Sequence, residues 1–335
     1  MKHTYTRVCI AGTVYPLLLY LLYSSEEEIH NTYFFFGRGV PHSIRQKFPN
    51  YYFFDEEQNK FKRKLMQNAI FMILFVRFGQ IIRWPFLRQV KIFGQDHLFY
   101  SCYLIGNKKY TLIEDAPHIM HLTEQKKHLF DYWKTDKFFK KRLLYKIIGG
   151  TFLHHIGDNN ICEEVILTVD ETAPHLKGKK RTVISTFSLW DNSTESKKDL
   201  ILRIYDIEKE DIAIMKSKEN VLFTQQFSSD GVITVEEQEH IYRQIIDNYN
   251  HNSILIKTHP RDFFDYKKAF PHIVVFNKIV PVQLFDLLGV KFKKAITVSS
   301  SAVTSFNYDL EIDWYGTEIS DSLLKAVGHC AMKVL

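Results

Sequence analysis

Four short polar segments in this chain each follow a run of apolar residues that predicts a β-strand. They begin at Glu114, Thr224, Lys257 and Ser299. In open α/β sheets, ligands bind beyond the carboxyl ends of the strands, where the loops of neighbouring strands meet. The side chains of these segments are therefore the first candidates for binding or catalysis.

Two of the segments carry carboxylates that suit general-base chemistry. Glu114 and Asp115 are adjacent and follow the predicted strand Tyr110–Ile113, whereas Asp230 precedes Gly231 in a polar loop. In a cleft, burial raises the pKa of such a carboxyl, so that it takes up a proton near neutral pH. The alternatives are an acidic turn at Glu114-Asp115 and an ordinary Asp-Gly turn at Asp230.

The segment after the predicted strand Ser253–Lys257 suits phosphate binding. His259 stands between Lys257 and Arg261, and Pro260 prevents the strand from continuing. A histidine between two cations is a poor metal ligand, but its N–H can donate to a phosphate oxygen while the two cations add charge-assisted bonds. The alternative is a surface loop with a capping histidine.

Three consecutive serines, Ser299, Ser300 and Ser301, follow the predicted strand Ala295–Val298 and precede an expected helix. Hydroxyls and free N–H groups at a helix start can hold a phosphate, although a simple serine cap gives the same pattern.

Several well-known catalytic patterns are missing from the sequence. It has no G-x-x-x-x-G-K-[ST], G-x-G-x-x-G, H-E-x-x-H, G-x-S-x-G or Asp-x-Asp. The histidines His118, His121, His154 and His155 lack partners at ligand spacing, so we interpret them as surface or hydrogen-bonded side chains. We expect no metal site.

The elements that must position these segments alternate between strands and helices. In the first half we predict strands at Val8–Ala11, Thr32–Phe36 and Val90–Phe93, and helices at Tyr15–Tyr23 and Asn59–Phe75. This alternation favours a parallel sheet with crossover helices.

The last third of the chain repeats the alternation. We predict strands at Val221–Gln225 and Ile273–Phe276, and helices at Thr234–Tyr249 and Pro281–Leu288. Ser185–Ser196 is interpreted as a loop between two halves. The expected fold is α/β, with two Rossmann-like domains, 1–185 and 186–335, and a central cleft.

The composition fits a globular protein. The 335 residues are 45% hydrophobic, and 44 basic against 38 acidic side chains give a net charge of +6. So small a surplus does not indicate nucleic-acid binding, but it is compatible with an anionic substrate or an anionic membrane surface. The four cysteines include no C-x-x-C pair, which favours a reducing compartment.

Neither strongly apolar stretch predicts a membrane span. Val8–Tyr23 contains Gly12, Pro16 and several hydroxyls, so we interpret it as a buried strand and helix and not as a signal peptide. Ala69–Phe78 is too short to cross a bilayer.

Taken in order, the motifs Glu114-Asp115, His259-Pro260 and Ser299-Ser300-Ser301 resemble the signature set of bacterial sialyltransferases. The chain is most similar to glycosyltransferase family 52, which includes lipooligosaccharide and capsular sialyltransferases. The likeness extends over Lys257–Arg261, Val298–Thr304 and Leu222–Gln225. The chain has Ala116 where the acidic motif usually has glycine, and Gln283 where a glutamate binds the donor ribose.

The resemblance implies a GT-B-type glycosyltransferase that uses CMP-N-acetylneuraminate as donor and a galactose-type hydroxyl as acceptor. Transfer with inversion then needs a carboxylate base, with Asp230 preferred and Asp115, of the pair with Glu114, second. His259 acts as acid or phosphate ligand. The implied donor-binding residues are Lys257, His259, Pro260, Arg261, Gln283, Ser299, Ser300 and Ser301. No cofactor and no metal are implied.

Two other functions stay open. One is a hexosyltransferase that uses a UDP-sugar, and the other is a non-catalytic protein of glycan assembly. The family's acceptors are lipid-linked or polymeric glycans, and its members include dimers. Basic stretches at Lys60–Lys64 and Lys126–Arg142 predict reversible attachment to the cytoplasmic face of the bacterial inner membrane.

Overall fold

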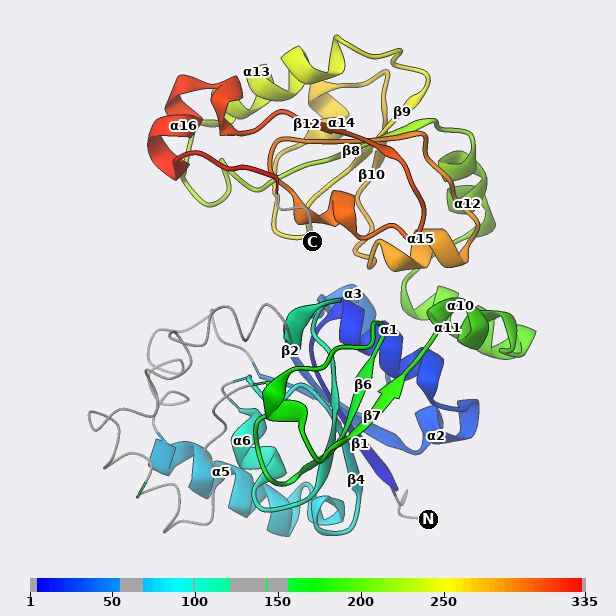
Figure 1. The fold of residues 1–335 in the computed structure, drawn as a ribbon, viewed down its shortest axis with the longest axis vertical. Coiled ribbons are helices and arrows are strands. Elements are labelled where there is room, and N and C mark those ends of the chain that lie inside the picture. The colour runs from blue at the N-terminus through cyan, green and yellow to red at the C-terminus, as the bar shows by residue number, and fades with distance from the viewer. Residues whose placement is uncertain (1–4, 55–68, 99, 121–142, 144–155, 333–335) are drawn as a thin grey trace. The chain divides into compact units, whose positions relative to one another are not determined.

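A computed structural model describes residues 5–54, 69–98, 100–120, 143 and 156–332. The chain forms two compact units, Met1–Ile204 and Tyr205–Leu335. Each unit is built around one sheet whose strands all run parallel (Figure 1). The predicted α/β class is therefore confirmed.

The first unit contains a seven-stranded sheet in the order β3-β2-β1-β4-β5-β6-β7. Its strands are β1 (Arg7–Thr13), β2 (Thr32–Gly39), β3 (Tyr51–Phe53), β4 (Lys91–Gly94), β5 (Tyr110–Ile113), β6 (Cys162–Leu167) and β7 (Lys180–Val183). The order reverses between β1 and β4, which is the point where ligands bind in doubly wound sheets. The predicted strands β1, β2, β4 and β5 are confirmed, whereas β3, β6 and β7 were not predicted.

Both faces of this sheet are covered, because alternate residues of a strand point to opposite sides. Val8 and Ile10 of β1 belong to a core cluster with α5 (Ala69–Ile82) and α6 (Ser101–Ile105). On the other face, α1 (Val14–Tyr23) places Tyr20 against Phe34 and Phe93. The stretch that resembled a signal peptide is thus a buried strand followed by a buried helix, as predicted.

Two further helices complete the first unit on the α1 side. They are α10 (Thr186–Asp191) and α11 (Glu195–Ile204), and Lys197 of α11 donates to the backbone oxygen of Leu22 at 2.7 Å. The prediction of a loop over Ser185–Ser196 is wrong, because the Ser185 side chain accepts from the N–H of Ser188 and caps α10. The domain boundary expected between residues 185 and 186 stays a prediction.

The second unit contains a five-stranded sheet in the order β10-β9-β8-β11-β12. Its strands are β8 (Asn220–Phe223), β9 (Ile254–Lys257), β10 (Val274–Phe276), β11 (Lys294–Thr297) and β12 (Glu311–Trp314). The order again reverses beside the first strand, between β8 and β11. The four strands predicted in this region are confirmed, and β12 is additional.

The helices of the second unit also lie on both faces of its sheet. Leu222, Ile254, Ile256 and Ile296 form one core cluster with α13 (Val235–Ile246) and with Tyr266 of α14 (Tyr266–Ala269). The opposite face is aromatic, since Phe223 contacts Phe306 and Phe276 contacts Phe285 of α15 (Gln283–Leu287). The unit also includes α12 (Lys209–Lys216) and α16 (Asp321–Val327).

No helix within the described part of the chain is long and apolar enough to cross a membrane. Some expectations lie outside the described residues: the first part of the predicted helix Asn59–Phe75, the basic stretches Lys60–Lys64 and Lys126–Arg142, and His121, His154 and His155.

Candidate active site

Glu114 lies at the carboxyl end of β5, and its side chain is completely buried. Its Oε1 accepts from the hydroxyls of Tyr15, at 2.6 Å, and Thr168, at 2.5 Å. Its Oε2 accepts from the backbone N–H of Thr168 at 3.0 Å. Both oxygens are therefore engaged, and the carboxyl group joins the ends of β5 and β6 to the start of α1.

Burial raises the pKa of Glu114 to about 7, although the bonds from Thr168 and Tyr15 act in the opposite direction. Burial is the largest effect because removing a carboxylate from water disfavours its charged form. The same burial, together with the Glu114 charge, raises the pKa of the Tyr15 phenol. Glu114 thus has an environment in which the neutral acid is favoured.

Asp115 reaches solvent, since 29% of its side chain is exposed. Its Oδ1 accepts a hydrogen bond from the Gln95 amide and a longer one from the Thr13 hydroxyl at 3.4 Å. Its Oδ2 lies 3.7 Å from Nε2 of His97. Of the predicted pair, Asp115 is the carboxylate with access to a substrate, and donors from β1 and the loop after β4 orient it.

The buried Gln95 holds this edge of the sheet together. Its side-chain oxygen accepts from the backbone N–H of Gly12, and its amide nitrogen donates to Asp115. The preceding Gly94 has a φ of +125°, and a Cβ there would lie 2.0 Å from the backbone oxygen of Ile10. Only glycine fits this contact between β1 and β4. The sequence pointed to the acidic pair but gave no signal for Gln95.

A hollow of about 420 Å³ opens where β5 and β6 end. Its walls are His118, three residues after Asp115, and the loop Val169–Pro174, which follows Thr168. His118 has a φ of 59°, which is uncommon for a residue with a side chain. The bonds between Thr168 and Glu114 hold the two walls together. Sequence reasoning interpreted His118 as an ordinary surface histidine and gave it no site role.

In the second unit, His259 follows β9 and is half-buried. Its backbone N–H donates to the Thr224 hydroxyl at 3.0 Å, and its Nδ1 accepts from the backbone N–H of Arg261 at 3.2 Å. With Nδ1 as acceptor, the neutral ring carries its proton on Nε2. Burial, and next the charge of Arg261, lower the pKa of His259. The imidazole is thus neutral at pH 7, with Nε2 as its donor.

Asp262 ties the loops at this edge together. Its carboxylate accepts from the hydroxyls of Thr224, at 3.2 Å, and Tyr266, at 2.7 Å, and from the Gln238 amide at 3.2 Å. Its negative charge also acts to raise the pKa of His259. Because Thr224 contacts both His259 and Asp262, the aspartate positions the histidine through one hydroxyl. The sequence placed Asp262 beside the His-Pro motif but assigned it no role.

Lys257 is buried at the end of β9, and its ammonium donates to the backbone oxygen of Thr258 at 2.8 Å. Burial lowers the pKa of Lys257 to about 8. Arg261 and Pro260 are exposed on the loop that follows. The structure therefore brings Lys257 and Arg261 to the same loop as His259, with one cation buried beneath it and the other exposed.

Asp230 lies in an exposed turn after β8. Its Oδ2 accepts from the Gln226 side chain at 3.0 Å, and its backbone N–H donates to Gln226 O at 2.9 Å. Gly231 follows with a φ of +72°, so the segment has the geometry of an Asp-Gly turn. Asp230 follows β8 and His259 follows the neighbouring parallel strand β9, so both lie at the same edge of the sheet, and the charge of Asp230 acts to raise the pKa of His259.

The serines after β11 form a tight turn. Ser300 is buried, its N–H donates to the Thr297 hydroxyl at 2.9 Å, and its Oγ accepts from Ala302 N–H at 3.3 Å. The helix expected after Ser301 is a single 3-10 turn, Ser301–Thr304. Ser300 is thus a cap whose hydroxyl proton can still be donated, while Ser299 is half-buried and Ser301 exposed. Gln283, also half-buried, begins α15.

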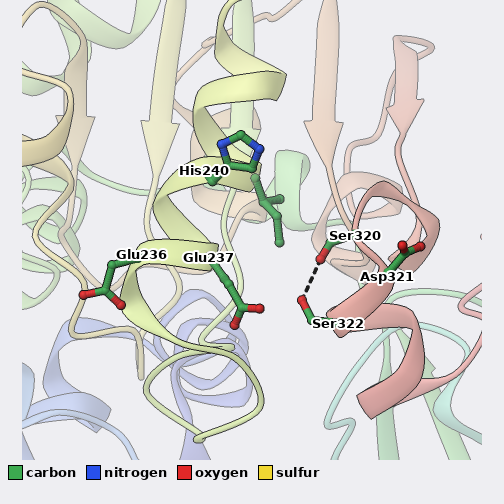
Figure 2. A pocket seen from close by; sticks show the side chains of 7 residues that line it. Glu236, Glu237, His240, Ser320, Asp321 and Ser322 are labelled. Carbon is green, nitrogen blue, oxygen red and sulfur yellow. Dashed lines mark hydrogen bonds between the residues drawn. The ribbon is translucent and has the colours of Figure 1, made fainter.

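A second hollow, of about 500 Å³, lies between the starts of α13 and α16 (Figure 2). Figure 2 shows the Glu237 side chain of α13 pointing toward Ser320 and Ser322 at the start of α16, whereas the Glu236 side chain points away from them. Glu237 belongs to a capping box with Thr234. The carboxylates that line the hollow, Glu236, Glu237 and Asp321, repel phosphate. This hollow is therefore not part of the candidate donor site. Within the described ranges, no group of three or more acidic, histidine or cysteine side chains could hold a metal ion.

Comparison with known proteins matches residues 41–323 to the family model of glycosyltransferase family 52. An uncharacterized protein of Haemophilus influenzae is 32% identical over 245 residues, which cover 72% of this chain and 74% of that protein.

Solved sialyltransferase structures share the fold. The alpha/beta-galactoside alpha-2,3-sialyltransferase of Photobacterium phosphoreum is similar over 97% of this chain and 95% of that chain, with a TM-score of 0.53 and 13% identity. A Photobacterium 2,6-sialyltransferase, solved with CMP and lactose, is similar over 92% of this chain and 70% of that chain, with a TM-score of 0.56 and 13% identity. The GT-B domain of the Photobacterium damselae sialyltransferase is similar over 96% of this chain and 96% of that chain, with a TM-score of 0.52 and 12% identity. The predicted GT-B architecture is confirmed.

Proposed function

Because the chain belongs to glycosyltransferase family 52, we propose that it is a sialyltransferase. It transfers N-acetylneuraminic acid from CMP-N-acetylneuraminate to a galactose-type hydroxyl of a bacterial surface glycan, either lipooligosaccharide or capsular polysaccharide. The observation that carries the proposal is the loop after β9. There a neutral His259 keeps its proton on Nε2, between one buried and one exposed cation.

The donor edge of the second unit suits a monophosphate. His259 Nε2–H donates to a phosphate oxygen of CMP, Arg261 and Lys257 supply positive charge, and the Ser299, Ser300 and Ser301 hydroxyls are further donors. Pro260 fixes the loop, and Gln283 at the start of α15 contacts the ribose. A monophosphate leaving group needs less charge neutralisation than a diphosphate, so we propose that transfer requires no metal and no cofactor.

Transfer proceeds in one step with inversion. The acceptor oxygen attacks the anomeric carbon of the sialic acid, and the bond from that carbon to the phosphate oxygen breaks. The acceptor's proton passes to a carboxylate, and the leaving phosphate oxygen receives the bonding electrons and a hydrogen bond or proton from His259. Asp230 is our first choice for the base and Asp115 the second. Glu114, buried and engaged at both oxygens, supports the position of Asp115.

The hollow at the ends of β5 and β6 suits the acceptor sugar. A hexose has polar hydroxyls at its edge and an apolar C–H face. The hollow offers polar groups at His118, Asp170 and Thr172, and an apolar wall at Ala173 and Pro174. If Asp115 is the base, the acceptor sugar binds at this end of the first unit.

A thermal-shift screen with CMP, UDP and GDP tests the donor. A ligand that binds only the folded protein raises its melting temperature, so CMP is expected to do so and the other two are not. Donor-hydrolysis assays then compare CMP-N-acetylneuraminate with UDP-glucose and UDP-galactose. Turnover of a UDP-sugar alone would replace the proposal by a hexosyltransferase. No turnover of any donor, with glycan binding unaffected by His259→Ala, would identify a non-catalytic binding protein.

We also propose that the protein attaches to the inner face of the cytoplasmic membrane, where lipid-linked acceptors are made. The net charge of +6 supports attraction to an anionic leaflet. Flotation with vesicles of phosphatidylcholine and phosphatidylglycerol, against phosphatidylcholine alone, tests this proposal. Equal recovery with both vesicle types would contradict an electrostatic attachment. A homodimer is compatible with this function.

A further inference from the structure

The loop that carries His259 also exposes a large aromatic side chain. Phe263 is 87% exposed, more than any other large apolar residue in the described part of the chain. Its neighbour Phe264 is partly buried and packs against the core of the second unit. Single exposed apolar residues are common at protein surfaces, so exposure alone assigns Phe263 no role. Its position points to one, because its backbone is held beside a candidate catalytic residue.

The backbone of Phe263 is tied to the turn that carries Asp230. Its N–H donates to Oγ of Ser229 at 2.9 Å, and the Ser229 hydroxyl donates to Oδ1 of Asp262 at 3.4 Å. The same Oδ1 accepts from the backbone N–H of Phe264 at 3.2 Å. Phe263 is therefore held on both sides, one hydrogen bond away from the residue that precedes Asp230. A ligand that contacts its ring does not have to order this loop first.

The loop at Phe263 is anchored to the face of the sheet that lies away from the proposed ribose contact. The ring of Phe264 contacts that of Tyr266, with centroids 4.7 Å apart, in the core cluster that α13 and α14 form on one face. Helix α15, which begins at Gln283, covers the opposite face. A nucleoside held by Gln283 is thus separated from Phe263, which leaves the ring to the other substrate, the acceptor.

The chemistry of the acceptor matches an exposed aromatic ring beside a base. If Asp230 takes the proton, the acceptor hydroxyl lies within hydrogen-bond distance of its carboxylate. The remainder of the sugar ring then occupies the surroundings of that carboxylate, which include Phe263. One face of a galactose ring carries C–H groups at C3, C4 and C5. A phenyl ring removes this apolar face from water while the hydroxyls at the edge of the sugar stay free to bond.

We propose that Phe263 is the platform for the acceptor sugar: the C–H face of the galactose lies on its ring while Asp230 takes the proton from a hydroxyl of the same sugar. This inference rests on the proposed sialyltransferase function with Asp230 as the base. It places the acceptor at the edge of the second unit and names a residue that sets acceptor affinity without contacting the donor.

Steady-state kinetics of the full-length protein with lactose test the platform. Phe263→Ala is expected to raise the KM for lactose about tenfold, because the C–H face loses its apolar contact. Its KM for CMP-N-acetylneuraminate and its CMP-induced thermal shift should match the wild type, because the nucleoside does not contact the ring. Phe263→Tyr keeps the aromatic ring and should retain the wild-type KM for lactose. Ile214→Ala, which changes an exposed apolar residue of α12 in the same unit, is the control.

Saturation-transfer NMR with lactose and the CMP-loaded protein measures the same contact without turnover. In the wild type, H3, H4 and H5 of the galactose should receive the strongest saturation, because these protons lie on the C–H face. Phe263→Ala should lose this pattern, whereas Phe263→Tyr and Ile214→Ala should keep it.

Several outcomes would overturn the platform, and they differ from failure of the enzymatic assignment. If Phe263→Ala keeps the wild-type KM for lactose while the protein transfers sialic acid, the platform is wrong and the sialyltransferase proposal stands. If Phe263→Ala lowers the melting temperature by several degrees, or converts a dimer to a monomer in sedimentation, the ring packs against protein and not against sugar. If CMP does not raise the melting temperature and lactose receives no saturation from the wild type, both proposals fail.

Discussion

The sheet edge that carries candidate residues in the first unit and the corresponding edge in the second unit are similar in topology and opposite in chemistry. In each unit the polar groups lie at the carboxyl ends of parallel strands, and the strand order reverses beside the first strand. At the edge of the first unit, carboxyl groups are held by hydroxyls and an amide. At the edge of the second, a neutral imidazole and two cations lie on one loop.

In the proposed reaction, the cationic edge suits the phosphate of the donor, and a carboxylate is needed to take the acceptor's proton. Asp230 and Asp262 are carboxylates on this cationic edge, and the charge of each acts to raise the pKa of His259. The predictions below test which edge supplies the base and how each edge is held.

The largest effect is expected from the general base. If Asp230 is the base, Asp230→Ala lowers kcat by about a thousandfold, while Asp115→Ala lowers kcat/KM for the acceptor by about tenfold. Steady-state kinetics with CMP-N-acetylneuraminate and lactose measure both. Near wild-type turnover in Asp230→Ala, with activity abolished in Asp115→Ala, would move the base to the first unit.

A loss of about a hundredfold in kcat is expected for His259→Ala, because the leaving phosphate then lacks its donor. His259→Gln restores part of the activity, since its amide can still donate to the phosphate. The control is His272→Ala, which changes an exposed histidine of the same unit and is expected to be neutral. Equal rates for His259→Ala and the wild type would exclude a role in departure of CMP.

A smaller effect, about tenfold in kcat/KM, is expected for Asp262→Asn, because the new amide N–H cannot accept from Thr224, Gln238 or Tyr266. The Asp262 charge acts to raise the pKa of His259. Its removal should therefore lower the pKa of His259 further, as measured by NMR titration of the ring proton. Asp265→Asn, a change at the nearby cap of α14, is the control. An unchanged His259 titration in Asp262→Asn would reduce the aspartate to a structural role.

The smallest effect concerns the pH dependence of stability and tests the protonation of the buried Glu114. Burial raises the pKa of Glu114 to about 7. Between the ordinary pKa of a glutamate side chain and pH 7, the folded protein therefore keeps a proton that the unfolded chain has released. The stability from this proton is complete at pH 4 and is lost as the pH rises through about 7.

Glu114→Gln removes this dependence, because the Tyr15 and Thr168 hydroxyls can reverse their bonds to a neutral amide. The variant should melt several degrees above the wild type at pH 8 and close to it at pH 5. The difference in melting temperature between the wild type and Glu114→Gln is measured at pH 5 and at pH 8. If this difference is the same at both pH values, the pKa of Glu114 is not raised.

Much of the site could be predicted from the sequence because its polar motifs directly follow apolar strands. The strands ending before Thr224 and His259 are buried neighbours in one parallel sheet, so their carboxyl ends lie at one edge, and the strand ending before Glu114 does the same within the other sheet. The loop predicted at Ser185–Ser196 was wrong for a local reason, since serines favour both loops and helix caps. The helix expected after Ser301 shortened to one 3-10 turn.

What the sequence by itself determined is the class of the fold, the family and the order of the chemical groups along the chain, because these depend on local pattern. Only the tertiary structure decided what each group does within its edge. Glu114 and Asp115 are neighbours in sequence, yet one is buried and the other reaches solvent, because alternate residues at a strand end point to opposite sides. Gln95, Gln238 and Asp262 position the site through contacts across 20 to 38 residues, which no local pattern contains. The exposure of Phe263 was equally hidden, since the sequence alone cannot tell which apolar residues of a loop the core covers.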